Sequence, residues 1–241
     1  MSVIGSNILA GASGAGGGAS GDIAVVHAND PEITVYPWGS GFGSKYANPS
    51  TLPAATGRGV AFSPDGNDIA VAHSSDPYVT AYPWSSGFGS KYSNPSTLPA
   101  GTGLKVAFSP DGNDIAVAHV SSPFISVYPW SSGFGSKYSN PSTLPSSTGN
   151  RVAFSPDGND IAVAHSLSPY ITVYSWSSGF GSKYANPSTL PTGTGRGVAF
   201  SPDGNDIAVA HDIFPIVTVY PWSSGFGSKY SDPSTLPTGV G

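Results

Sequence analysis

The sequence contains no cysteine, and only 10% of its 241 residues are charged. Disulfides, thiolate metal ligands and cysteine nucleophiles are therefore excluded. The net charge is −5 and lysine and arginine do not cluster, so we expect no binding of nucleic acid, which depends on neutralising phosphates. No apolar run is long enough to cross a membrane, and Met1–Ile4 lacks the basic start of a secretion signal, so we expect neither a membrane span nor a signal peptide.

Glycine (32 residues) and proline (23 residues) are abundant, and aromatic residues make up 12% of the chain. A high glycine and proline content is typical of disordered chains. Disordered chains, however, lack the apolar side chains that offset the entropy of folding. A turn-rich all-β fold agrees with both features.

Histidine and tryptophan each occur five times, at a constant step of 46 residues. The tryptophans are Trp38, Trp84, Trp130, Trp176 and Trp222. The histidines are His27, His73, His119, His165 and His211. This period divides the chain into units 12–57, 58–103, 104–149, 150–195 and 196–241. A fixed period of this length indicates a repeat architecture.

Within the unit 58–103 the pattern predicts four short strands, separated by turns rich in glycine, proline, asparagine and aspartate. They are Gly59–Phe62, Asp68–His73, Tyr78–Trp84 and a last strand near Lys91–Tyr92. Such a unit cannot bury both faces alone, so neighbouring units must cover each other. We therefore predict an all-β, five-bladed β-propeller of four-stranded antiparallel blades. A parallel β-solenoid is the alternative, but its coils are usually shorter than this unit.

The run Val60–Gly66, with the sequence Val-Ala-Phe-Ser-Pro-Asp-Gly, recurs in the later units. It resembles the first strand and turn of WD40-like propeller repeats, and the resemblance extends over about nine-tenths of the chain. The match departs from that family because Trp-Ser or Trp-Gly replaces Trp-Asp and no Gly-His pair precedes the first strand. The resemblance therefore implies the architecture and does not transfer the family's hydrogen-bond network or a function.

The first unit differs from the others at its start. Residues 12–21 are almost entirely glycine, alanine and serine where later units have the first strand and its turn. We therefore predict a first blade without a regular inner strand, and a propeller domain over residues 21–241. The gap is expected to be filled by the preceding leader or by another subunit, because an unpaired strand edge favours association.

Residues 1–20 form a leader outside the repeat pattern, and we interpret it as an attachment segment. Its part Ser6–Gly14 resembles the opening of many structural proteins of marine tailed phages. That resemblance implies a location in a phage particle; extracellular or cytoplasmic locations are the alternatives. The apolar leader residues expected to contact a partner are Ile4, Ile8 and Leu9.

Catalysis requires different groups that converge on one point, whereas each histidine here occupies an equivalent place in its own unit. Five histidines spread around a ring cannot share a metal, whose ligands must lie about 2 Å from it. The Ser-Pro-Asp-Gly-Asn-Asp turns lack the alternating oxygen ligands and distal glutamate of a calcium loop. We therefore predict no enzyme activity, no cofactor and no metal.

The loops of an antiparallel blade emerge alternately on two faces. The loops between the first and second strands and between the third and fourth strands hardly vary among units, whereas the other two loops do. One face is thus expected to be nearly fivefold symmetric and the other individual in each blade. On the variable face, Ile213, Phe214 and Ile216 are candidate contacts with a protein partner, because exposed apolar patches commonly mark interfaces.

Two further candidate sites follow from the repeats. One basic residue near the start of the first strand of each complete unit predicts a cationic ring at the channel mouth, formed by Arg58, Lys105, Arg151 and Arg196. The five tryptophans, on the symmetric face, are candidate glycan contacts, since aromatic rings offer flat apolar surfaces and repetition provides avidity. The unit length and blade number are similar to those of five-bladed lectin propellers.

Together these features favour a noncatalytic structural or interaction propeller displayed on a larger assembly, with a phage virion as the predicted setting. Its expected partners are protein subunits that contact the leader and the variable face. A carbohydrate-binding lectin or adhesin with repeated inter-blade sites is the alternative, with cell-surface glycans as its partners.

Overall fold

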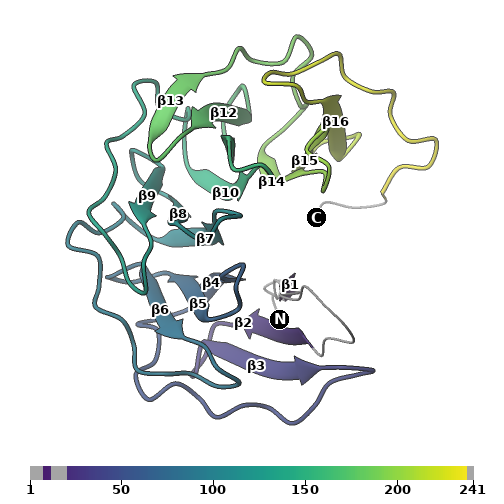
Figure 1. The fold of residues 1–241 in the computed structure, drawn as a ribbon. Helices are drawn as coiled ribbons and strands as arrows, with labels where there is room; N and C mark the ends of the chain where they lie inside the picture. Colours follow the sequence, from purple (N-terminus) through teal and green to yellow (C-terminus); the bar gives the residue numbers. More distant parts are fainter. Residues whose placement is uncertain (1–7, 12–20, 238–241) are drawn as a thin grey trace.

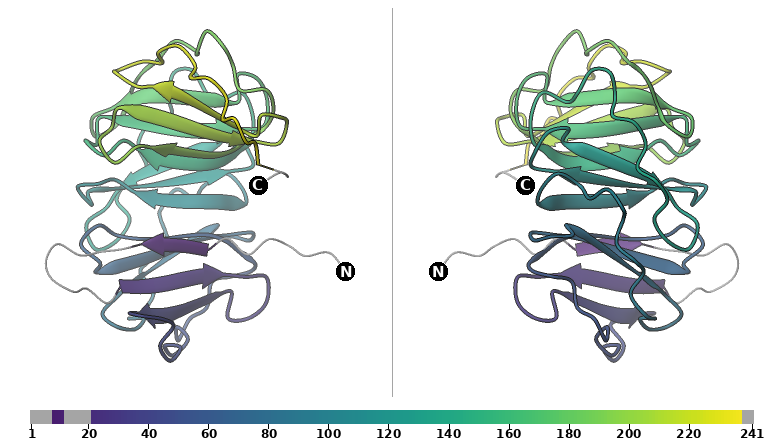
Figure 2. Two further views of the ribbon diagram at one scale, coloured as in Figure 1. Left: turned by 90° about the vertical axis from the view of Figure 1, so that its right-hand side faces the viewer. Right: turned by 90° about the vertical axis from the view of Figure 1, so that its left-hand side faces the viewer.

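The computed structural model describes residues 8–11 and 21–237 of the chain. Every helix or strand position in these residues is occupied by a β-strand. The strands form five antiparallel sheets that follow one another along the sequence. Figure 1 shows the sheets arranged as an arc around a central space, and Figure 2 shows their stacking from two sides. No helix in this part of the chain is long and apolar enough to span a membrane. The expectation of an all-β fold of repeated antiparallel sheets is confirmed.

The first two sheets contain β1 (Ile8–Gly11), β2 (Gly21–Val26) and β3 (Ile33–Trp38), then β4 (Gly57–Phe62), β5 (Asp68–His73) and β6 (Val79–Pro83). The next two contain β7 (Gly103–Phe108), β8 (Asp114–His119) and β9 (Ile125–Pro129), then β10 (Gly149–Phe154), β11 (Asp160–His165), β12 (Ile171–Trp176) and β13 (Phe180–Lys183). The last contains β14 (Gly195–Phe200), β15 (Asp206–His211) and β16 (Val217–Pro221).

The inner strand of each complete unit begins two residues earlier than its sequence pattern predicts. In the second sheet, Gly57 pairs with His73 and Gly59 with Ala72, so Arg58 is an extra residue in a β-bulge. Gly57 is required here because a Cβ atom at this position would lie 2.5 Å from the carbonyl oxygen of Glu32. The bulge therefore depends on a close approach between backbones of neighbouring sheets.

The fourth strand is regular in one sheet only, which corrects the prediction of uniformly four-stranded blades. β13 pairs with β12 in the fourth sheet, whereas the equivalent residues elsewhere form a single bridge such as Trp84 with Phe88. The fourth unit has Ser175 where the others have a proline such as Pro83. Proline lacks the N–H that a strand ladder needs, and its replacement by serine accompanies the complete strand.

The first sheet has a strand at the inner position, and the leader supplies it, which is one of the two predicted ways of filling the gap. β1, from the leader, pairs antiparallel with β2, with Leu9 opposite Ala24 and Gly11 opposite Asp22. A four-residue segment of the leader thus takes the place of the inner strand that the glycine-rich stretch cannot supply. The rest of that stretch, residues 12–20, lies outside the described residues.

The core lies between the sheets. At the second interface, Ile115 and Val117 of β8 lie in one cluster with Ala70 and Ala72 of β5, and all four are fully buried. Equivalent clusters occur at the other three interfaces between successive sheets. Each buried isoleucine or valine contributes about 1.5–3 kcal/mol. The sheets are therefore stabilised mainly by their neighbours, as in other repeat architectures.

Candidate functional site

Each interface between successive sheets contains a buried tryptophan that reaches back to an aspartate of the preceding sheet. Trp176 Nε1 donates to Asp114 Oδ2 at 2.9 Å, and the hydroxyl of Tyr138 donates to Asp114 Oδ1 at 2.8 Å. The Tyr138 and Trp176 rings meet edge to face with centroids 5.3 Å apart. The same arrangement joins Trp84 to Asp22, Trp130 to Asp68 and Trp222 to Asp160.

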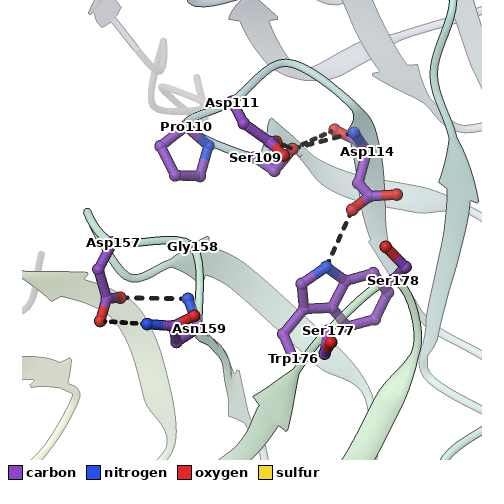
Figure 3. Close-up of a pocket in the computed structure, with 10 residues that line it drawn as sticks. All are labelled: Ser109, Pro110, Asp111, Asp114, Asp157, Gly158, Asn159, Trp176, Ser177 and Ser178. Atoms are coloured by element: carbon purple, nitrogen blue, oxygen red, sulfur yellow. Dashed lines mark hydrogen bonds between the residues drawn. The ribbon is translucent and has the colours of Figure 1, made fainter.

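Polar pockets lie beside three of these links, on the symmetric face. The pocket between the third and fourth sheets has a volume of about 200 Å³. Figure 3 shows that its wall combines the turn at Ser109–Asp111, the turn at Asp157–Asn159 and the end of β12 at Trp176. The two equivalent pockets have volumes of about 470 and 450 Å³. Because aspartate, serine and asparagine line them, these pockets suit a hydroxylated or otherwise polar ligand better than an apolar one.

One carboxylate of each turn, such as Asp157, is hydrogen-bonded within the turn that carries it. Asp157 accepts hydrogen bonds from Ser155 Oγ at 2.6 Å and from the backbone and side-chain amides of Asn159 at 3.1 and 2.8 Å. These bonds, with that from Ser155 the strongest, hold the pKa of the Asp157 carboxyl below its usual range. The described residues contain no group of three or more histidine, cysteine, aspartate or glutamate side chains that could hold a metal ion.

The tryptophans proposed as glycan contacts are mostly buried between sheets. Trp84, Trp130, Trp176 and Trp222 are each only 5% exposed, so their ring faces pack inside the protein. Trp38 differs, because it is 40% exposed, although like the others it packs edge to face on the phenylalanine that follows it, here Phe42. The structure therefore presents polar turn groups, and little aromatic surface, at the three inter-sheet pockets.

The histidines lie inside the sheets, one in each. His73 is fully buried, and its Nε2 lies 2.9 Å from Thr80 Oγ1 on the neighbouring strand. Burial lowers the pKa of His73 to about 4, and it does the same for His119 and His165. These histidines are structural hydrogen-bonding groups of strand ends.

The four basic residues of the predicted ring lie on the inner strands but in two different positions. Arg58 and Arg196 occupy the bulged position, whereas Lys105 and Arg151 lie one residue later and pair across the ladder. Lys105 Nζ donates to the carbonyl of Val60 at 3.3 Å. Burial, followed by the charge of Arg151, lowers the pKa of Lys105 to about 7.

Three neighbouring basic residues of the inner strands affect one another's pKa. Burial and then the charge of Arg196 lower the pKa of Arg151. Arg196 itself forms an ion pair with Asp212 at 3.0 Å. The inner strands thus bring Lys105, Arg151 and Arg196 together. That these cations form an anion-binding site stays a prediction.

The variable face carries exposed apolar side chains in three consecutive units. Among large apolar residues, Val120, Leu167, Ile213 and Phe214 are exposed, and all four lie in loops between the second and third strands. The backbone of this loop in the last unit is fixed by Thr192, whose hydroxyl donates to the carbonyl of Phe214 at 2.8 Å. We call these four residues the apolar row.

The other candidate partner contacts have mixed positions. Ile216 is buried, 6% exposed, and so cannot contact a partner in this state. Ile8 and Leu9 lie in β1, and Ile4 lies outside the described residues. Val120 and Leu167 were not predicted as partner contacts. The same loop carries polar residues in the first two units, so an apolar side chain at this place was a signal in the sequence.

The aspartates that accept hydrogen bonds from the tryptophans were also not predicted from the sequence. Asp68 and its equivalents recur with the same 46-residue step, each at or next to the start of a strand, and in β5, β8 and β11 the other side chains of that strand are all buried. A charged residue at the edge of such a strand needs a partner. The need of each aspartate for a partner, together with the tryptophan repeated at the same step, could have predicted this hydrogen bond.

A series of short antiparallel sheets that stack around a central space defines the class of propeller-like folds. No protein-family model matches the sequence, and no curated protein matches it. Among solved structures, a candidate 6-phosphogluconolactonase of Bacteroides uniformis is 16% identical, with a TM-score of 0.62 over 87% of this chain and 66% of the other.

Two further solved structures show the same likeness. A candidate 6-phosphogluconolactonase of Bacteroides fragilis is 14% identical, with a TM-score of 0.64 over 87% of this chain and 65% of the other. The hydrazine synthase of Kuenenia stuttgartiensis is 15% identical, with a TM-score of 0.62 over 85% of this chain and 61% of the other. This chain thus spans slightly less than two thirds of the length of each. These structures carry the names of enzymes, and at this identity the likeness shows the fold alone.

Proposed function

We propose that the protein is a noncatalytic interaction module whose variable face binds another protein of a larger assembly. The apolar row is the observation that supports this proposal. Exposed apolar side chains that cluster on one face commonly mark protein interfaces. The opposite face has turns of nearly constant sequence, and its exposed large apolar side chains, Trp38 and Phe42, both belong to the first unit, whereas the row extends over three units.

The loops of the row are held in place by hydrogen bonds to the segment that leads into each inner strand. The N–H of Val120 donates to the carbonyl of Thr102 at 3.1 Å, and the N–H of Leu167 donates to Ser147 Oγ at 2.9 Å. A fixed backbone reduces the entropy lost when a partner binds. The row therefore has two properties of a binding surface, apolar contact area and a preorganised backbone.

The setting that we propose is a phage particle, with the leader as the attachment segment. The leader's sequence supports this setting by its resemblance to phage structural proteins. β1 of the leader pairs with β2, and residues 1–7 lie outside the described part.

Site-specific photocross-linking within the assembled particle tests the proposal. A photoreactive residue at Leu167 or Phe214 should form one predominant adduct with another structural protein. The matched control is the same residue at Ser132, on the symmetric face. Equal labelling from both faces, or labelling from Ser132 alone, would refute the proposal. Phe214→Ser should also reduce incorporation of the protein into particles while leaving its thermal unfolding unchanged.

A second candidate function is carbohydrate binding, and the three equivalent polar pockets are the observation that favours it. Three weak sites on one face would provide avidity. Their carboxylates and hydroxyls are the groups that bind sugar hydroxyls. A glycan array tests this candidate, with Asp111→Asn and Asp157→Asn expected to reduce any signal and Phe214→Ser expected to leave it unchanged. Absence of signal for the unaltered protein would refute it.

A further inference from the structure

The inner strands of the last four sheets carry positive charges and no negative ones. β4, β7, β10 and β14 each contain one basic residue, and none of the four strands contains aspartate or glutamate. The basic residues are Arg58, Lys105, Arg151 and Arg196, each at the second or third position of its strand. Because these strands face the central space (Figure 1), the four cations lie at the same end of it.

Close contacts hold successive inner strands together at this end. A Cβ atom at Gly59 of β4 would lie 2.8 Å from the Cα atom of Lys105 on β7. Between β10 and β14, Asn150 Nδ2 donates to the carbonyl of Gly195 at 2.8 Å. The cations of neighbouring strands are therefore kept near one another by the backbone, and their mutual repulsion costs free energy.

Lys105 is the most enclosed cation of the group without a carboxylate. It is half-buried, whereas Arg58 and Arg196 are exposed. Its Nζ donates to the carbonyl of Val60 at 3.3 Å, which uses one of the three donors of an ammonium group. Arg196 has an ion pair with Asp212, but no ion pair between described residues includes Lys105. An anion beside Lys105 would stabilise its charged form.

We propose that this end of the central space binds a small oxyanion with two or more negative charges, of the sulfate or phosphate class, with Lys105 as the central contact and Arg151 beside it. Two charges suit the site because cations of adjacent strands lie next to each other there. A small ligand is favoured over a macromolecule because Lys105 is half-buried between β4 and β7. The site is separate from the apolar row, so neither proposal depends on the other.

Anion binding should be linked to protonation of Lys105. Burial and the charge of Arg151 lower the pKa of this lysine to about 7. The ionisable residues of the strands packed against β7 are Arg58 on β4, Asp68 and His73 on β5, Asp114 and His119 on β8, and Arg151 on β10.

None of these other groups changes charge near neutral pH. Arginine keeps its charge, and burial lowers the pKa of both histidines to about 4. The two aspartates lie at the opposite ends of their strands, where they accept hydrogen bonds from Trp130 and Trp176. Between about pH 6 and 8, Lys105 is therefore the group in these surroundings that gains or loses a proton.

A nuclear magnetic resonance titration of the full chain with sulfate tests the proposal, since sulfate keeps its two charges throughout this range. The amide signals of β7 and β10 near Lys105 and Arg151 should shift. The dissociation constant should be roughly 10-fold lower at pH 6 than at pH 8, because a lysine with this pKa is mostly protonated at the lower pH and mostly neutral at the higher. Inorganic phosphate should compete with sulfate, and sodium chloride at the same ionic strength is the control for screening.

Three variants locate the site. Lys105→Met should raise the dissociation constant at least roughly 10-fold at pH 6, since it removes the central charge. Lys137→Met, in the same unit, is the matched control and should bind sulfate unchanged, because Lys137 Nζ donates to the carbonyl of Tyr138, outside the inner strands. Lys105→Arg should bind equally well at both pH values, because a guanidinium keeps its charge. The fold already accepts arginine at the equivalent place in the next unit, as Arg151.

Three results would overturn the proposal. One is an unchanged dissociation constant in Lys105→Met that is folded by circular dichroism. Another is the same set of shifts from sodium chloride at equal ionic strength, because that result indicates screening alone. The third is a pH dependence that persists in Lys105→Arg, because another group would then be the one that titrates.

Discussion

Acidification should destabilise this protein below about pH 6.5, because three buried histidines stay uncharged in the folded state. His73, His119 and His165 are fully buried, and burial lowers the pKa of each to about 4. In the unfolded chain these groups bind protons below about pH 6.5. The unfolded state therefore binds more protons than the folded state between about pH 6.5 and 4, and stability falls as the pH falls through this window.

The size of the effect follows from the pKa difference. Between pH 7.5 and 5 each of these histidines should remove about 2 kcal/mol from the free energy of unfolding, or about 6 kcal/mol for the three. Glu32 acts in the opposite direction, because burial raises its pKa to about 7. The contribution of Glu32 to the free energy of unfolding is full below the unfolded pKa of about 4.5 and is lost as the pH rises to 7. Acidification from pH 7.5 to 5 therefore restores about 2 kcal/mol of this free energy. The net loss at pH 5 should be about 4 kcal/mol.

Urea unfolding followed by tryptophan fluorescence at a series of pH values measures this effect. His73→Gln should reduce the net loss by about half, since it removes about 2 of the 4 kcal/mol and glutamine can keep a hydrogen bond to Thr80 without binding a proton. Glu32→Gln should increase the loss. A free energy of unfolding that stays constant from pH 7.5 to 5, or an unchanged slope in His73→Gln, would refute the reasoning.

Two substitutions test the backbone features of the sheets. Gly149→Ala should destabilise the fold by about 2–4 kcal/mol, because the added Cβ would lie 2.2 Å from the carbonyl oxygen of Phe124; Gly21→Ala, with no atom within 4 Å, is the control for thermal unfolding. Pro129→Ser should complete a fourth strand in the third sheet, seen as slow hydrogen exchange of the new amide at position 129, because the N–H of Gly135 already donates to the carbonyl of Pro129 at 2.8 Å. Rapid exchange at position 129 would mean that proline does not interrupt that strand.

Much of the fold could be predicted from the sequence because each repeat carries its own local signals. The strand Asp68–His73 has its predicted bounds, and the strand predicted at Tyr78–Trp84 is observed at Val79–Pro83. The bulge at Arg58 was not predictable from strand patterns, because it depends on how closely Gly57 approaches the next sheet. The incomplete fourth strands were predictable in principle from the proline that precedes the tryptophan in every unit except the fourth.

The candidate sites were harder to predict because they depend on contacts between sheets. The tryptophans were recognised as important, but their burial follows from the distant aspartates that bind them, such as Asp114 for Trp176. Whether the ends of the arc meet depends on the rotation between neighbouring sheets. That rotation is a property of packed side chains, and identical repeats do not encode it in any local pattern.

The tryptophan–aspartate link reaches back by one unit and no further. In-frame loss or duplication of a 46-residue segment would consequently leave every surviving junction with its full set of contacts. A gene of this kind can shorten or lengthen by whole modules through recombination between its near-identical stretches, and the product would differ in span while keeping both of its terminal surfaces.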